Sequence, residues 1–346
     1  MFDRIVARAT DDGKHSNPWV RSPGGELQFE PDYNTLEELL GVPLYLKAPT
    51  QSGVPALALD VWLSYELRRA GFNMDQVWPR PVPPRILPAP VAALLKMKGM
   101  PKEIREYLKK RISKASISGV TSSSASILGK NYVKQVDVII SDWDTGPELL
   151  ISSKRMDSSY AKNAPNRIEE SYGDAKNLRL RHPLAALGFV FGLRSDILNE
   201  EPVTAEWLFD LLAKLGQEDD AYHATCVLLI KYAGPGDVPS VNSGDETPTN
   251  RAPQSGFEPD AEADSLPPTL AAEIKAEVEG EVERAITHLP KVTILRKETP
   301  ENLDPGRFLA AMVGRVLRTT PVNRHVQARK NRNSPREAPI LDHSAA

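Results

Sequence analysis

The sequence predicts a mixed α/β protein in which one β-sheet is flanked by helices, with further helices towards both ends of the chain. The main observation is a hairpin of two apolar segments, 136–141 and 148–155, joined by the turn-forming residues 142–147. A second observation is that predicted helices and strands alternate after this hairpin. The third is composition, because 346 residues with 40% hydrophobic side chains can bury a large core.

The segments before the hairpin are mainly helical. Residues 1–34 are polar and contain Gly and Pro, so we expect an irregular arm, followed by a short capped helix over 34–40. Residues 55–72 are richly apolar and predict a longer helix. Five prolines within 79–88 exclude a helix or a central strand and predict an extended strap. Residues 89–114 predict two helices separated by a Gly-Met-Pro sequence.

After the hairpin, helices and strands alternate. A helix over 165–180 should begin at Pro165, a favourable first-turn residue, with a loop before it. Apolar segments predict buried strands over 184–193 and 222–232, with an amphipathic helix over 203–215 between them. Beyond these, the sequence predicts a charged helix, a strand and an amphipathic helix over 270–288, 291–295 and 305–317.

These elements divide the chain into five parts, because composition changes sharply between them. The parts are an N-terminal arm with a short helix (1–54), a core domain (55–233), a disordered acidic linker (234–268), a C-terminal helical segment that packs on the core (269–320) and a basic flexible tail (321–346).

Charge is unevenly distributed although the net charge is only −3. Residues 96–114 carry eight basic and two acidic side chains, whereas residues 234–268 carry seven acidic and one basic. The basic segment has two interpretations that the sequence leaves open. It either faces a polyanion or forms the solvated face of a helix.

The composition also narrows the class of protein. Cys226 is the only cysteine, which excludes an internal disulfide and a cysteine-rich zinc site and suits the cytoplasm. The sequence contains no apolar run long enough for a membrane span, and its first residues lack a signal pattern. We therefore expect a cytoplasmic protein. The motifs of P-loop NTPases, dinucleotide-binding enzymes and serine hydrolases are also missing.

The hairpin carries residues suited to phosphodiester chemistry. Asp137 lies on its first strand and Lys154 near the end of its second, so the two side chains can meet at one end of the sheet. Strand alternation places Ser152 on the same face as Lys154. Mg²⁺ prefers carboxylate and water oxygens, and a nearby lysine can hold the attacking water and offset negative charge.

This order of Asp-bearing strand, turn, Lys-bearing strand, helix and buried strand resembles the core of the PD-(D/E)XK nuclease superfamily, chiefly over residues 130–195. The resemblance implies a restriction-endonuclease-like fold and Mg²⁺-dependent cleavage of DNA, with Mn²⁺ as a substitute ion. It also implies a type II restriction or antiphage-defence setting, with a homodimer or a defence-system partner protein as further options. By resemblance, Asp137 binds metal and Lys154 positions the attacking water.

The sequence departs from the family pattern at Ser152, which occupies the position of the second metal-binding acid. Some restriction enzymes with Ser-x-Lys on this strand supply the acid from the following helix, and Glu169 and Glu170 lie on the corresponding helix here. Glu169 is the first choice, since Glu170 faces about 100° away on an α-helix, but both remain candidates. Glu148 is a weaker substitute, and Glu66 is expected to pair with an arginine at the surface.

Bases and amides around the hairpin and the following helix are candidates for nucleic-acid binding, because such groups at a helix start can hold phosphates or read base edges. Ordinary solvation of the helix end is the alternative. The candidates are Lys134, Arg155, Lys162, Asn163, Arg167 and Lys176.

Structural interpretations of the hairpin residues also stay open. Asp137 can end a strand ladder or pair with Lys134, and Lys154 can protect an edge strand from aggregation. The functional alternative is a catalytically inactive nuclease-fold subunit that binds nucleic acid or assembles a defence complex.

Overall fold

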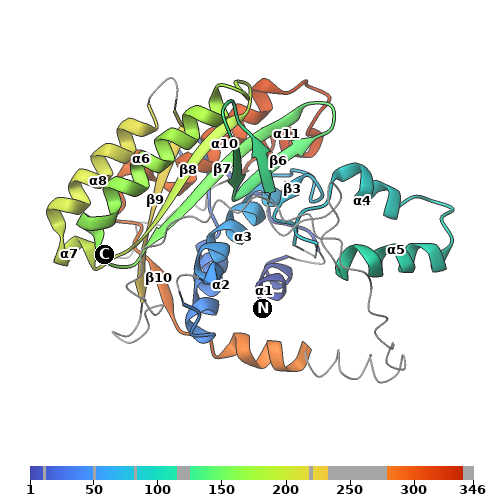
Figure 1. Ribbon diagram of the computed structural model, residues 1–346, viewed down its shortest axis with the longest axis horizontal. Helices are drawn as coiled ribbons and strands as arrows, with labels where there is room; N and C mark the ends of the chain where they lie inside the picture. Colours follow the sequence, from blue (N-terminus) through green and yellow to red (C-terminus); the bar gives the residue numbers. More distant parts are fainter. Residues whose placement is uncertain are drawn as a thin grey trace.

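The computed structural model describes residues 1–10, 13–49, 52–81, 84–114, 125–217, 221–232 and 279–337. Its centre is a six-stranded mixed sheet in the order β10-β9-β8-β7-β6-β3 (Figure 1). The parallel strands β7, β8 and β9 form the middle, and antiparallel neighbours complete both edges. The strands are β3 (Val77–Trp78), β6 (Val138–Asp142), β7 (Gly146–Met156), β8 (Ala186–Arg194), β9 (Ala224–Tyr232) and β10 (Val292–Ile294).

Helices cover both faces of this sheet, which confirms the predicted mixed α/β class with additional helices towards both ends of the chain. Strand alternation assigns side chains to the two faces, since Leu149 and Ile151 belong to one apolar cluster and Leu150 to the other. The first face packs against α2 (Tyr33–Tyr45), α3 (Val54–Arg69) and α10 (Pro305–Thr319), and the second against α6 (Tyr160–Arg179) and α8 (Pro202–Leu215).

Close packing of α10 on the sheet depends on a glycine. A Cβ at Gly188 of β8 would lie 2.7 Å from the ring of Phe308 and 2.8 Å from the sulfur of Met312. Both side chains are buried against the first face. Any larger residue at this position would push the helix away from the sheet.

Helix α6 begins at Tyr160, five residues before the predicted start at Pro165. Pro165 lies in the second turn rather than the first. The buried Tyr160 side chain bonds to Asp196, and the backbone N–H of Ala161 donates to the Glu201 carboxylate at 2.8 Å. These tertiary contacts extend the helix beyond the boundary that the proline indicated.

Both ends of the described chain are more ordered than predicted. Residues 1–34 form α1 (Phe2–Arg8), β1 (Trp19–Arg21) and β2 (Leu27–Phe29) instead of an irregular arm. The described part of the expected flexible tail, 321–337, instead contains α11 (Val326–Asn333) and β11 (Arg336–Glu337), and β11 pairs in parallel with β1. The pairing partner of β1 is thus more than 300 residues away in sequence, too remote for local patterns to reveal.

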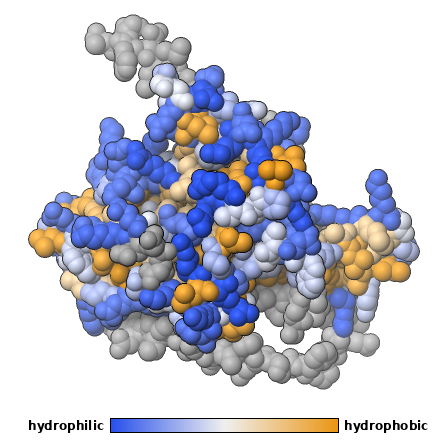
Figure 2. Space-filling view, turned by 90° about the horizontal axis from the view of Figure 1, so that it is seen from above, coloured by the Kyte–Doolittle hydropathy of each residue, from blue (hydrophilic) through white to orange (hydrophobic). Residues whose placement is uncertain are grey.

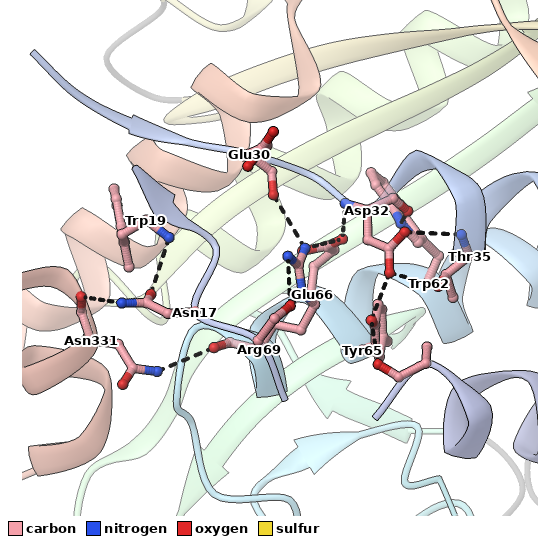
Figure 3. Close-up of polar contacts among 12 residues, drawn as sticks. Asn17, Trp19, Glu30, Asp32, Thr35, Trp62, Tyr65, Glu66, Arg69 and Asn331 are labelled. Carbon is pink, nitrogen blue, oxygen red and sulfur yellow. Dashed lines mark hydrogen bonds and ion pairs between the residues drawn. The ribbon is translucent and has the colours of Figure 1, made fainter. Parts of the chain in front are cut away.

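A polar network joins these segments to α3 (Figure 3). The fully buried Glu66 accepts hydrogen bonds from Arg69 at 3.0 and 2.7 Å and from the Asp32 backbone N–H at 2.7 Å. Asn331 donates to the Arg69 carbonyl at 3.2 Å. Glu66 therefore pairs with an arginine as expected, but in the interior rather than at the surface.

The remaining described elements lie around the sheet. They are α4 (Ala89–Leu95), α5 (Lys102–Lys114), the paired strands β4 (Ala125–Leu128) and β5 (Val133–Val136), α7 (Ile197–Glu200), the 3₁₀ helix η2 (Glu301–Leu303) and a helix over 279–287. The predicted acidic linker, 234–268, lies outside the described residues. No helix within the described ranges is long and apolar enough to cross a membrane.

Candidate active site beneath helix α6

The hairpin of β6 and β7 places Asp137 and Lys154 at the same end of the sheet. Asp137 directly precedes β6, and its Oδ2 accepts a hydrogen bond from the backbone N–H of Ser153 at 2.7 Å. The carboxylate thus ends the ladder, as the structural alternative predicts. Strand β7 is central, with β6 and β8 on its two sides, so Lys154 does not protect an edge strand.

Helix α6 brings a second carboxylate to Lys154. The Glu170 Oε1 lies 3.1 Å from the Lys154 Nζ and 3.4 Å from the Lys134 Nζ, and the Glu170 Oε2 lies 3.7 Å from the Arg167 Nη1. Lys134 also forms an ion pair with Asp174 one turn further along the helix. The result is a half-buried cluster of alternating charges between β5, β7 and α6.

Of the two candidate glutamates, the structure brings Glu170 to the cluster and leaves Glu169 exposed. The cause is helix geometry, because neighbouring residues point about 100° apart. Ile168 and Ser171 are buried on the same side of α6, which fixes the rotation of the helix. The preference for Glu169 therefore does not match the geometry.

Lys134 is held in place by the β4–β5 hairpin, which is attached to the same helix. The Asn177 Oδ1 accepts the backbone N–H of Asn131 at 2.8 Å, and its Nδ2 donates to the Tyr132 carbonyl at 3.1 Å. The Tyr132 hydroxyl donates to Asp174 at 3.0 Å. Helix α6 thereby positions one lysine through the hairpin and contacts the other directly.

The two carboxylates differ in electrostatic environment. Burial raises the pKa of Asp137, although Lys154 and Lys134 favour its charged form. Partial burial alone would raise the pKa of Glu170 too, but Lys154, Lys134 and Arg167 hold it below its ordinary value. Glu170 is therefore the more strongly ionised acid of the cluster.

A buried carboxylate on the other face of β7, that of Asp60 on α3, was not identified from the sequence. Its Oδ1 accepts the Ser153 hydroxyl at 2.6 Å, on the opposite face of β7 from Lys154. Burial, and then the neighbouring charge of Asp137, raise the pKa of Asp60. The only signal in the sequence is an acid placed between Leu59 and Val61 in an apolar helix, where buried charge is costly.

Ser152 occupies the position of the missing acid and is buried. It stands opposite Phe189 of β8, and its side chain hydrogen-bonds to Tyr222. Tyr222 in turn donates to the Ser171 carbonyl at 2.9 Å. Ser152 thus links the strand to α6 through Tyr222.

Glu148 lies outside this cluster. The β6–β7 register shifts between Ile140 and Ser141, and this irregularity breaks the alternation that would place Glu148 on the face of Lys154. Its Oε2 instead lies 2.6 Å from the Nε2 of His325, just before α11.

The candidate nucleic-acid-binding residues divide into two groups. Arg155 is only 5% exposed, because it pairs with Asp157 at 3.0 Å beneath α3. The structure therefore does not present Arg155 to a ligand. The others lie around the cluster or along α6: Lys162 and Lys176 are exposed, whereas Lys134, Asn163 and Arg167 are half-buried.

The donor set limits the metals that the site can hold. No group of three His, Cys, Asp or Glu side chains within the described ranges is arranged around a common ion position. Zinc is usually enclosed by three or four protein ligands, and the described residues contain no such set. Mg²⁺ needs fewer protein ligands, since it is commonly bound by one or two carboxylates together with water and phosphate oxygens.

Comparison with known proteins gives no match to any family model, curated protein or solved structure. The fold and the site thus define a mixed α/β protein with an acid–lysine–acid cluster at one end of its sheet, without assignment to a family.

Proposed function

We propose that this protein is a Mg²⁺-dependent endonuclease of the PD-(D/E)XK type that hydrolyses DNA phosphodiester bonds in restriction or antiphage defence. The observation that carries the proposal is the contact between Lys154 and Glu170 beside Asp137. It brings an amine and a helix-borne acid together next to the Asp-bearing strand, as a Ser-x-Lys nuclease site requires.

Asp137 and Glu170 would hold Mg²⁺, or Mn²⁺ in its place. The ion would supply Lewis acidity and lower the pKa of a bound water. Lys154 emerges from a central strand and is fixed by Glu170, so its ammonium is oriented before a substrate arrives. Its role would be to orient the attacking water and to offset charge on the phosphate.

The surrounding residues would support this chemistry rather than take part in it. Ser152 would fill the vacated acid position and hold α6 through Tyr222. Lys134 is a second cation near Glu170 that can neutralise a phosphate. The side chains of Lys162, Asn163, Arg167 and Lys176 would contact the DNA backbone along α6.

The alternative function, a catalytically inactive subunit that binds nucleic acid or assembles a defence complex, also has an observation in its favour. The Asp137 carboxylate is half-buried and already accepts a hydrogen bond from Ser153. Burial favours its protonated form, which is a poor ligand for Mg²⁺.

Plasmid cleavage distinguishes the two functions. Purified protein is incubated with supercoiled DNA in Mg²⁺, Mn²⁺ or EDTA, alongside Lys154→Ala, Asp137→Ala and the surface control Lys291→Ala. We expect relaxation or linearisation with either metal, lost in EDTA and in both site variants but kept in the control. DNA binding without cleavage in either metal would support the inactive subunit instead.

A further inference from the structure

Helices α4 and α5 form a hairpin that stands outside the two layers of helices on the sheet (Figure 1). It has a small apolar cluster of its own, made of Leu87, Ala92 and Ile112. An ion pair between Lys96 and Asp75 fixes its base. The α4–α5 hairpin is therefore a projection with its own packing, which leaves much of its surface uncovered.

This projection is strongly basic. Residues 96–114 contain eight basic and two acidic side chains, and Lys98, Lys102 and Lys109 are exposed. Lys109 pairs with Glu106 at 3.1 Å, a surface contact of small energetic value. The sequence of the hairpin carries six more basic than acidic side chains over residues 96–114, and such an excess of positive charge attracts anions.

Apolar side chains are exposed among these cations. Ile104 is 51% and Tyr107 62% exposed on α5, and Leu94 and Met97 are similarly exposed on or just after α4. Figure 2 shows apolar atoms at the right-hand end of the molecule, where the hairpin lies in Figure 1. Ile104 and Tyr107 are three positions apart and share one helix face.

In the chain, the hairpin lies between β3 and β4. Strand β3 is the edge strand that pairs with β6. Strand β4 pairs with β5, which carries Lys134 to its contact with Glu170. The hairpin lies beyond the β3 edge of the sheet (Figure 1).

We propose that the α4–α5 hairpin binds the phosphate backbone of DNA beside the cleavage site, with Tyr107 against an exposed base or sugar. The choice of ligand rests on the proposed nuclease function. Several exposed lysines suit a phosphate chain, and an aromatic ring among them suits stacking on a base. An anionic membrane is less well matched, because the four exposed apolar side chains of the hairpin are divided between α5 and the residues on or just after α4, and of the described side chains of α5 only Ile104 and Tyr107 are large, apolar and exposed.

Fluorescence anisotropy in EDTA, with a labelled DNA duplex that carries a single-stranded overhang, tests this binding without cleavage. The charge-reversal pair Lys98→Glu/Lys102→Glu is compared with Lys291→Glu/Lys297→Glu, two exposed lysines beside β10 at the opposite edge of the sheet. We expect the hairpin pair to weaken binding about tenfold at moderate salt and to reduce the slope of log K against log salt by about 2. The control pair should change affinity less than twofold.

Tyr107→Ala provides an independent test, since it leaves the charge unchanged. Stacking of one base on an aromatic ring is worth about 1–3 kcal/mol, so loss of the ring should weaken binding about fivefold or more. Circular dichroism and thermal unfolding verify that each variant folds. Equal losses in the hairpin and control pairs, or no loss in either, would overturn the proposal.

The outcomes also separate this inference from the proposed function. If the wild type cleaves DNA but the hairpin pair binds DNA as tightly as the wild type does, the inference fails and the nuclease stands. If DNA binding depends on the hairpin but no metal supports cleavage, the inference stands and the nuclease fails. Hairpin-dependent binding to phosphatidylserine vesicles with unchanged DNA affinity would show a membrane surface instead and overturn the inference.

Discussion

Lys154 on β7 and Glu170 on α6 lie 3.1 Å apart although they are 16 residues apart in sequence. Helix α6 connects the parallel strands β7 and β8, so it runs back across the sheet from the end of one strand to the start of the next. This path brings Glu170 to Lys154 near the end of β7. The same crossing leaves Glu169 in solvent. The site therefore depends on the rotation of one helix about its own axis.

The first prediction concerns this rotation. Glu170→Gln should lower the cleavage rate about 10²-fold or more, because in the proposed mechanism the Glu170 carboxylate binds the metal ion and the amide that replaces it is uncharged. Glu169→Gln is the matched control and should leave the rate within about twofold. Initial rates of plasmid relaxation in Mg²⁺ measure both. A larger loss in Glu169→Gln would mean that α6 presents its other face to the substrate.

The second prediction concerns the role of Lys154 as distinct from its ion pair. Lys154→Met keeps the length of the side chain but removes the charge, and should lower the cleavage rate about 10²–10⁴-fold, the range of a general acid–base or electrostatic group. DNA affinity in EDTA should change much less. If affinity and rate fall in parallel, Lys154 binds DNA without taking part in the chemistry.

The local patterns of the sequence were sufficient to predict the central strands. Two apolar segments and the turn at 142–147 predicted the hairpin, which the structure confirms as β6 and β7. The prediction of an irregular arm and a flexible tail at the two ends of the described chain was wrong for a physical reason. Trp19 and Phe29 pack edge to face within segments that are otherwise polar, and their burial depends on α10 and α11, which are far away in sequence.

The candidate site was predicted only in part, because its members come from four elements. The two apolar segments predicted that Asp137 and Lys154 lie on one hairpin, although Asp137 directly precedes β6 instead of lying on it. The choice between Glu169 and Glu170 needed the rotation of α6, which tertiary contacts of Tyr160 help to set. Asp60 was missed because a helix pattern cannot show that its carboxylate meets Ser153.

The third prediction uses the environment of Asp60. Its pKa is raised in the folded protein by burial and then by Asp137, so folding favours its protonated form. The folded state therefore loses stability as pH rises above the ordinary value of about 4. Asp60→Asn removes this loss, and its amide oxygen can still accept the Ser153 hydroxyl. The variant should melt above the wild type at pH 8 and show no such advantage near pH 4.

Differential scanning calorimetry at several pH values measures this difference, with a shift of about 2–4 °C for each kcal/mol. Asp210→Asn is the control, since this exposed aspartate of α8 forms only a surface pair with Lys214. The control should change the melting temperature by a similar small amount at each pH. If Asp60→Asn destabilises the protein more strongly at pH 8 than at pH 4, the ionised carboxylate is needed for folding.

The fourth prediction concerns Glu148, which pairs with His325 at 2.6 Å while its other oxygen accepts the Thr145 hydroxyl at 2.6 Å. Both partners of the pair are buried. His325→Ala leaves a buried carboxylate with one partner fewer, which should cost about 3 kcal/mol of the free energy of unfolding. Arg307→Ala, which breaks an exposed pair with Glu301, should cost no more than about 1 kcal/mol.

Urea unfolding followed by circular dichroism gives both values by linear extrapolation. The same variant also decides whether Glu148 belongs to the active site, since it stands six residues before Lys154, about 20 Å along a strand. At a temperature where His325→Ala is fully folded, cleavage should therefore equal that of the wild type. A fully folded His325→Ala protein with lost activity would place Glu148 in the chemistry and remove Glu170 as the sole replacement for the missing acid.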